Sequence, residues 1–176
     1  DVIGREWQLG TIQLDFSLPE RFDLNFVDQE GNLQRPVVIH RAMLGSLERF
    51  LGVFIEHCGG ALPMWLAPKQ VTIIPIADRH IEYCSEILDF LRRRGIRADI
   101  DTRNDRMAAK IRDAQILKTP YMLVIGDREM EQGQVTLRFR TGESVSALSK
   151  EEIGALLVET ASSRSWDLGQ TLLGKG

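Results

Sequence analysis

The hydrophobic pattern of the chain changes at Leu66-Ala67-Pro68, and no other feature constrains the fold as strongly. Before this point, short segments alternate apolar and polar residues, which is typical of half-buried antiparallel strands. After it, continuous apolar runs alternate with segments of helical spacing, which is typical of a sheet covered by helices. The sequence therefore predicts two domains, 1–66 and 67–162, followed by a loose tail over residues 163–176.

The first domain is predicted to be an α+β fragment with an antiparallel sheet. Thr11–Leu18 and Phe22–Val27 alternate apolar with polar residues, and Pro36–Arg41 is rich in β-branched residues. A turn over residues 28–32, which contains Asp, Gly and Asn, separates the second and third of these strands. Leu47–His57 then places apolar residues on one helical face.

The second domain is predicted to be α/β with a mixed sheet. Its segments follow the order β-α-β-α-β-β-α, which places helices on the faces of the sheet. The predicted strands span Val71–Ile76, Ile96–Ile100, Tyr121–Ile125 and Gln134–Arg140. The predicted helices span 81–91, Met107–Leu117 and Glu151–Ala161.

Composition excludes several classes of protein. The net charge of −3 argues against binding of nucleic acid through overall charge, although a local basic stripe can still bind RNA. Cys58 and Cys84 form no CxxC pair, so we expect reduced thiols in a cytoplasmic protein. No apolar run is long enough to span a membrane. The first residues lack an initiator Met and signal-peptide character, so we expect an internal part of a longer protein.

Several segments resemble a known family. Residues 36–50, PVVIHRAMLGSLERF, resemble motif 3 of class II aminoacyl-tRNA synthetases, most closely the threonyl enzymes. Residues 4–16 resemble the strand before motif 3, and Leu66–Gln70 resembles the junction to an anticodon-binding domain. Arg103-Asn104-Asp105 and Pro120–Asp127 resemble landmarks inside that domain. The resemblance covers nearly the whole chain.

This resemblance implies a threonine–tRNA ligase, in which part of a class II catalytic domain precedes an anticodon-binding domain. Such an enzyme joins threonine to the α-phosphate of ATP, which binds with magnesium, and then transfers threonine to its tRNA. Motifs 1 and 2 of the family are absent from this chain, so we expect these 176 residues alone to be inactive. The resemblance also implies a homodimer for the whole enzyme.

Arg49 is the predicted catalytic residue. Joining two anions requires cations aimed at phosphate oxygens, and a guanidinium can hold phosphate through two hydrogen bonds. By resemblance, Arg49 is the ATP-binding arginine of motif 3. The residues alone are also compatible with a solvated helix arginine paired with Glu48 or Glu56.

His40 ends an apolar strand, where a lone histidine is more often a core residue than a ligand. By resemblance, it is one ligand of a zinc ion that holds the amino group and hydroxyl of threonine. A metal that requires an oxygen ligand rejects the near-isosteric valine, which an apolar pocket separates poorly. The other two family ligands, a Cys and a His, have no match here, so the chain cannot complete the zinc site.

Four polar residues match family positions that line the threonine and ATP pocket. They are Gln8, Thr11, Gln13 and Ser46. Thr11 and Gln13 share one face of a strand, and Ser46 is also a predicted helix N-cap. Without the resemblance, Gln8, Thr11 and Gln13 are explained as ordinary polar residues on a solvent-facing strand. Ser46 is then explained as a simple helix cap.

Five residues match family positions near the tRNA anticodon: Asn104, Arg112, Lys118, Glu129 and Arg138. Threonine anticodons share G at the middle position and U at the third. Arg138 can present a fork to a guanine edge, Glu129 can accept from a guanine amino group, and Lys118 suits a phosphate. Taken singly, each is also compatible with a solvated surface residue.

Two other functions remain open. One is a non-catalytic tRNA-binding module or synthetase paralogue, although such a module needs neither His40 nor Arg49. The other is a prolyl, histidyl or glycyl enzyme with the same type of anticodon domain, but those enzymes do not recognise their substrate through zinc.

Overall fold

The computed structural model describes residues 1–168, and the chain divides into two units, Asp1–Gly59 and Gly60–Gly176. The division falls before the boundary expected at residue 66. The Arg140 guanidinium explains this difference, because it donates to the carbonyls of Leu62 and Ala61 at 2.6 and 3.1 Å. The segment before Pro68 is therefore held by the second unit.

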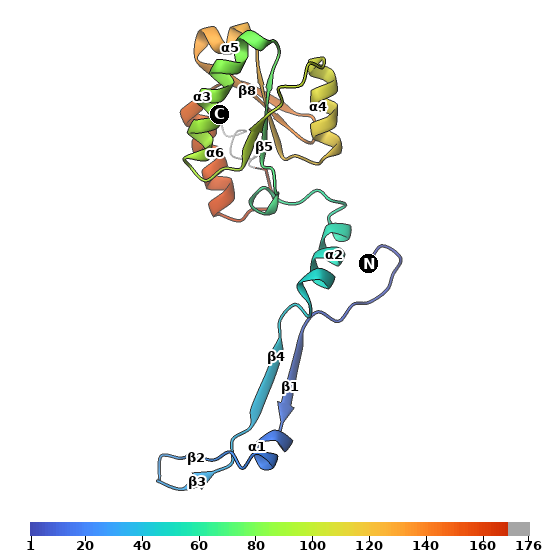
Figure 1. Ribbon diagram of the computed structural model, residues 1–176, viewed down its shortest axis with the longest axis vertical. Helices are drawn as coiled ribbons and strands as arrows, with labels where there is room; N and C mark the ends of the chain where they lie inside the picture. The colour runs from blue at the N-terminus through green and yellow to red at the C-terminus, as the bar shows by residue number, and fades with distance from the viewer. Residues whose placement is uncertain (169–176) are drawn as a thin grey trace. The chain divides into compact units, whose positions relative to one another are not determined.

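The first unit consists of two short antiparallel ribbons and two helices (Figure 1). β1 pairs with β4, and Gln13 lies opposite His40 in this register. β2 pairs with β3 around the predicted turn. The elements are β1 (Thr11–Asp15), α1 (Ser17–Arg21), β2 (Phe26–Val27), β3 (Leu33–Gln34), β4 (Val38–Ala42) and α2 (Leu47–His57).

The predicted strands Thr11–Leu18 and Phe22–Val27 are too long. Asp15 Oδ1 accepts hydrogen bonds from the backbone N–H groups of Ser17 and Leu18, both at 2.9 Å, so helix α1 starts where the strand was expected to continue. Asp23 has a φ of +51°, which breaks the extended backbone before Phe26. The helix Leu47–His57 is confirmed.

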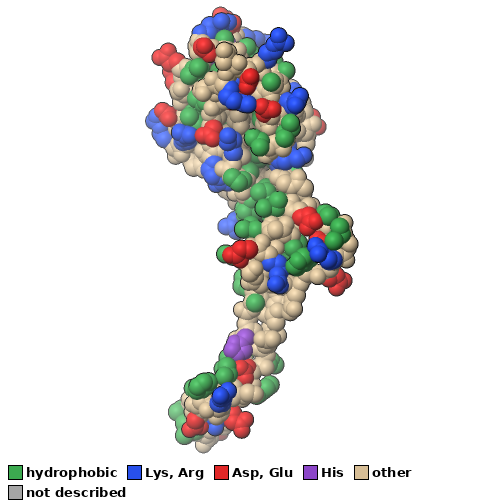
Figure 2. Space-filling view, turned by 45° about the vertical axis from the view of Figure 1, so that its right-hand side comes forward, with side chains coloured by type: hydrophobic (Ala, Val, Ile, Leu, Met, Phe, Trp, Pro, Cys, Tyr) green, Lys and Arg blue, Asp and Glu red, His purple; other side chains and the backbone are tan. Residues whose placement is uncertain are grey.

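The first unit has almost no interior. Pro19 is its single buried residue among positions 1–59, all of which are described. Ile12, Leu14 and Ile39 are 61–62% exposed on one face of the β1–β4 ribbon. Many apolar side chains accordingly lie on the surface in Figure 2. Backbone pairing and local hydrogen bonds, rather than a core, define this unit.

The second unit contains a five-stranded mixed sheet in the order β6-β5-β7-β8-β9. β5, β6 and β7 are parallel, whereas β8 and β9 are antiparallel to their neighbours. This confirms the predicted mixed sheet. The strands are β5 (Val71–Pro75), β6 (Ala98–Ile100), β7 (Tyr121–Ile125), β8 (Gln134–Phe139) and β9 (Ser144–Ser149).

Helices cover both faces of this sheet (Figure 1). α3 (Ile81–Arg92) and α6 (Lys150–Ser162) pack with one face to form the main core. α4 (Met107–Ile116) packs on the other face, where Ala114 contacts Ile74 and Met122 in a small cluster. α3 and α6 lie close together, since a Cβ at Gly154 would lie 2.7 Å from the Phe90 ring.

In the second unit, the sequence missed one helix and one strand and misjudged the tail. α5 (Asp127–Gln132) and strand β9 were not predicted. The expected loose tail is anchored in part, because Leu168 is 4% exposed and its carbonyl accepts from the Tyr121 hydroxyl at 2.8 Å. The rest of that tail, 169–176, lies outside the described residues. None of the helices within residues 1–168 has the length and apolar character needed to cross a membrane.

Candidate functional sites

One face of the β1–β4 ribbon is polar. Because side chains alternate along a strand, Thr11, Gln13 and Asp15 share a face, and His40 joins them as the register partner of Gln13. A groove of about 640 Å³ lies on this part of the unit, lined by Gln13, Leu14, Asp15, Phe16, Ser17 and His40. The structure therefore places two predicted pocket residues, Gln13 and His40, side by side.

Asp15 orients the His40 ring. His40 Nε2 lies 2.9 Å from Asp15 Oδ2, and the backbone N–H of Leu18 together with this ring lowers the pKa of Asp15 below its ordinary value. A carboxylate on one ring nitrogen is the usual second partner of a metal-binding histidine, and it directs the other nitrogen, Nδ1, to a ligand. Among residues 1–168, no group of three or more His, Cys, Asp or Glu side chains could hold a metal ion, so the described residues do not contain a complete metal site.

Arg49 stacks on an indole ring. Its Cζ lies 5.8 Å from the centre of the Trp7 ring, and Arg5 approaches the same ring at 5.3 Å. Trp7 Nε1 in turn donates to Asp1 Oδ2 at 2.9 Å. Within the described part of the chain, Arg49 forms no ion pair with Glu48 or Glu56. The alternative left open by the sequence, that Arg49 pairs with a neighbouring glutamate, therefore does not explain how this guanidinium is held.

The start of α2 lies beside the segment that leads into β1. Ser46 Oγ accepts from the backbone N–H of Arg49 at 3.2 Å, which confirms the predicted N-cap. Gly45 has a φ of +66°, and a Cβ there would lie 3.5 Å from the Leu9 carbonyl oxygen. Gln8 Nε2 donates to Thr11 Oγ1 at 2.8 Å. These contacts gather four predicted residues, Gln8, Thr11, Ser46 and Arg49, at one end of the ribbon.

His40 and Arg49 occupy different parts of this region. His40 lines the groove over β1, whereas Arg49 is not among the residues that line it.

In the second unit, strand β8 presents a polar stripe. Val135, Leu137 and Phe139 are buried in the main core, so Thr136 and Arg138 point to the opposite face, which α4 covers only in part. Arg138 is half-buried, and its Nε–H is buried without a partner among the described residues. A buried guanidinium nitrogen without an acceptor is costly, so an acceptor supplied to Arg138 would be favourable.

Lys118 and Glu129 lie at opposite ends of β7. Lys118 has a φ of +56° just before the strand, and its carbonyl accepts from Arg140 at 3.4 Å. Glu129 follows the strand, and its two oxygens accept from the Gly126 N–H at 3.0 Å and from Thr136 Oγ1 at 2.9 Å. Glu129 therefore joins the start of α5 to β8 through these two hydrogen bonds, independently of any contact with an RNA base.

Asn104 and Arg112 are exposed on the loop before α4 and on α4 itself. The five predicted anticodon residues therefore surround one face of the sheet rather than a single point. The sequence missed Asp15 and Trp7, which hold His40 and Arg49. Asp15 was detectable, since it continues the spacing of Thr11 and Gln13 by two residues. No local signal identified Trp7.

Two family models match this chain. Residues 70–160, more than half of the chain, match the anticodon binding domain, and residues 1–58 match the tRNA synthetase class II core domain of the G, H, P, S and T enzymes. The chain belongs to the anticodon-binding domain family. Its first unit is a class II synthetase core fragment, so the resemblance identified from the sequence is confirmed.

Curated relatives of this anticodon-binding chain are threonine–tRNA ligases. The protein from Deinococcus radiodurans is 51% identical over 94% of this chain and 26% of its own length. The protein from Desulforamulus reducens is 56% identical over 85% of this chain and 24% of its own length. The chain thus spans about a quarter of the length of these relatives.

Solved structures agree with this assignment. The RNA binding domain of threonyl-tRNA synthetase from Cryptosporidium parvum superposes with a TM-score of 0.80 at 40% identity, covering 95% of this chain and 42% of that one. Prolyl-tRNA synthetase from the same organism gives a TM-score of 0.72 at 27% identity, covering 96% of this chain and 37% of that one.

Proposed function

We propose that this chain is part of a threonine–tRNA ligase and that its second unit binds the anticodon loop of threonine tRNA. The identity of 51–56% with threonine–tRNA ligases supports the substrate, because the match extends over both units. The observation that carries the proposal is the polar stripe on β8, where the Nε–H of Arg138 is buried without a partner.

Base recognition follows from the placement of these groups. A guanidinium that is half-buried in a sheet has little freedom, so it can present two parallel donors to the O6 and N7 atoms of a guanine. Exposed Arg112 and Lys118 border the same face and suit backbone phosphates. Single-stranded anticodon bases can be splayed onto such a surface.

The first unit contributes to the proposed ATP and threonine pocket. Arg49, held against Trp7, would bind ATP phosphate oxygens, with magnesium supplying further positive charge to the nucleotide, and Gln8, Thr11 and Ser46 would supply polar contacts to the adenylate. Gln13 lies beside His40 and contacts threonine. His40 would hold zinc through Nδ1 while Asp15 accepts its Nε2–H, and the bound metal would select a hydroxyl-bearing substrate. We also propose a cytoplasmic homodimer for the whole enzyme.

Substitution of Arg138 tests the tRNA site. Arg138→Ala is expected to weaken binding of threonine tRNA to the 176-residue chain by about 1–3 kcal/mol, measured by filter binding or fluorescence anisotropy. Arg138→Lys keeps the charge, so we expect it to retain phosphate attraction but lose discrimination against a tRNA with a substituted middle anticodon base.

Arg93→Ala is the matched control, because Arg93 is exposed at the end of α3, on the other face of the sheet. Unchanged affinity in Arg138→Ala, with Arg93→Ala also unchanged, would remove Arg138 from the site.

A further inference from the structure

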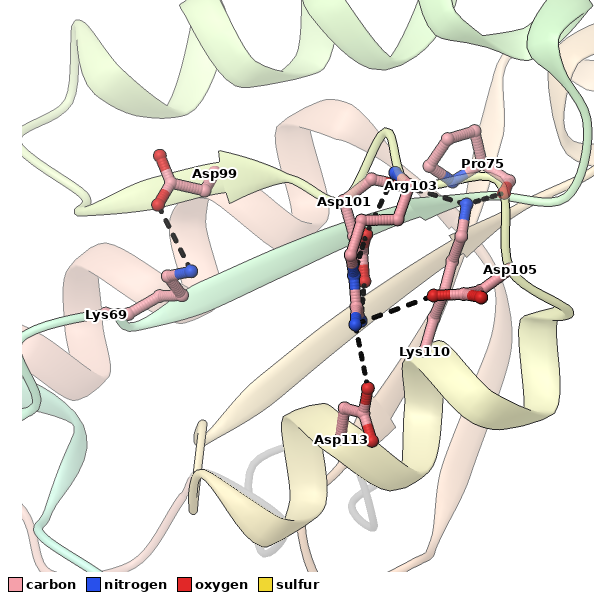
Figure 3. A network of polar contacts seen from close by, with 8 residues as sticks. All are labelled: Lys69, Pro75, Asp99, Asp101, Arg103, Asp105, Lys110 and Asp113. Atoms are coloured by element: carbon pink, nitrogen blue, oxygen red, sulfur yellow. Dashed lines mark hydrogen bonds and ion pairs between the residues drawn. The ribbon is translucent and has the colours of Figure 1, made fainter.

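A network of charged side chains holds the loop that carries Asn104 (Figure 3). This loop runs from the end of β6 at Ile100 to the start of α4 at Met107. Asn104 lies in this loop and is exposed. An exposed loop of this length, unless tied down, samples many conformations, and ordering it on binding lowers affinity.

Arg103 is the centre of the network. Its Nε and one terminal nitrogen donate to the two oxygens of Asp101 at 2.9 and 2.7 Å, and the other terminal nitrogen donates to Asp113 Oδ2 at 2.9 Å. Asp105 lies at 3.6 Å from the same nitrogen. Asp113 belongs to α4, so this guanidinium fastens the loop to the helix that follows it.

Lys110 provides a second anchor from inside. Its side chain is nearly buried, and its ammonium donates to the backbone carbonyl of Asp101 at 3.0 Å and of Pro75 at 3.5 Å. These carbonyls lie at the carboxyl ends of β6 and β5, so a single cation joins both strand ends to α4. The loop therefore leaves the sheet from a fixed point.

The charges of the network argue against direct contact with RNA. Three carboxylates, of Asp101, Asp105 and Asp113, surround one guanidinium, and the Asp101 side chain is only 11% exposed. Arg103 lowers the pKa of Asp101 below its ordinary value, so this carboxylate stays ionised at neutral pH. A phosphate would meet a net negative cluster here, which is unfavourable.

We infer that Arg103, Asp113 and Lys110 are positioning residues that hold the 101–106 loop so that Asn104 is pre-organised to contact an anticodon base. This inference rests on the proposed tRNA-binding function. Pre-organisation raises affinity by removing the ordering cost, without adding a contact to the ligand.

Asp113→Ala tests the inference, because electrostatics alone predicts the opposite result. Removing an acidic residue beside an RNA site strengthens binding if charge alone matters. Loss of positioning instead weakens it, and we expect about 5–10-fold lower affinity of the 176-residue chain for a threonine tRNA anticodon stem-loop at fixed salt. Asp89→Ala, an exposed aspartate on α3, is the matched control and should not weaken binding.

Coupling to Asn104 distinguishes positioning from a general structural effect. In an Asn104→Ala background, Asp113→Ala should cause no further loss beyond about twofold, because the contact that it positions is already absent. The slope of affinity against salt concentration should also stay unchanged, since no phosphate contact is removed. Lys110→Met, checked for folding by circular dichroism, should show the same non-additivity.

Equal or tighter binding by Asp113→Ala, or fully additive losses with Asn104→Ala, would overturn the inference. If Asn104→Ala and Arg138→Ala both leave affinity unchanged, the proposed tRNA function fails instead. The two failures are therefore separable.

Discussion

The two units differ in how their structure is maintained. The second unit buries a core of apolar side chains between its sheet and helices α3 and α6. The first buries Pro19 alone and exposes both faces of its main ribbon, yet its strands, turns and caps are well formed. Within this chain, the first unit is therefore held by local hydrogen bonds and strand pairing, which provide little of the free energy that burial of apolar surface supplies.

The two cysteines give the largest expected contrast between the units. Burial raises the pKa of Cys84, in the second unit, to about 12, against an ordinary value of 9.0. Because the thiolate is the reactive form, we expect alkylation of Cys84 at neutral pH to be about 1,000-fold slower than that of an ordinary thiol. Partly exposed Cys58 should react first. Mass spectrometry of iodoacetamide-treated protein measures both rates, and comparable rates would contradict the burial difference.

Truncating one leucine in each unit tests the core directly. Leu123 is fully buried on β7, so Leu123→Ala should lower the free energy of unfolding of the second unit by about 2–5 kcal/mol. Leu14 is 61% exposed on β1 of the first unit. Leu14→Ala should therefore change the free energy of unfolding of the first unit by less than about 0.5 kcal/mol. Urea unfolding followed by circular dichroism measures both. A comparable loss in the two variants would show that the first unit has an interior.

A matched pair of helix caps sharpens the comparison. Ser149 caps α6 by accepting from the Glu152 N–H at 3.2 Å, and Ser46 caps α2 in the same way. Ser149→Ala should cost about 1 kcal/mol of unfolding free energy, because α6 is packed into the core. Ser46→Ala should instead increase local fraying of α2, which has no buried residue. Hydrogen exchange of backbone amides distinguishes local fraying of α2 from a loss of global unfolding free energy. Global destabilisation by Ser46→Ala would argue that the two units do not unfold independently.

The smallest expected effect concerns an ion pair at the surface of the second unit. Arg79 and His80 donate to Asp127 and lower the pKa of its carboxyl below the ordinary 3.8. A carboxyl whose pKa is lower in the folded state than in the unfolded state stabilises the folded protein at pH values above its unfolded pKa. This stabilisation is lost as the pH falls through the pKa of the folded state. Asp127→Asn should therefore lower Tm at pH 7, and the difference should shrink below about pH 4. A difference independent of pH would show that charge is not involved.

Sequence patterns predicted the elements that are buried on both faces. β7 was predicted with its observed bounds, Tyr121–Ile125, because a continuous apolar run reports burial directly. β9 was missed, since three of its six residues are serines and pairing with β8 makes the segment a strand. α1 was missed because it depends on the side chain of Asp15 as a hydrogen-bond acceptor.

The sequence named the candidate site residues singly but did not predict how they are arranged. Resemblance to motif 3 identified His40 and Arg49, whereas the contacts that orient them come from Asp15 and Trp7, which are distant in sequence. Likewise, Arg103 was noted only as part of a landmark, and its contact with Asp113 emerges from the packing of α4 beside the loop. Side-chain networks of this kind depend on tertiary structure, which periodicity does not encode.

The guanidinium of Arg140 determines where the second unit of this molecule can be excised. Because it donates to the carbonyls of Ala61 and Leu62, a recombinant fragment that begins at Pro68 would lack both acceptors. The same cut would remove the Trp65 carbonyl from Arg97 and the Met64 carbonyl from Gln70. Grafting of this domain onto another protein therefore requires a junction ahead of Ala61, within the two glycines at positions 59 and 60.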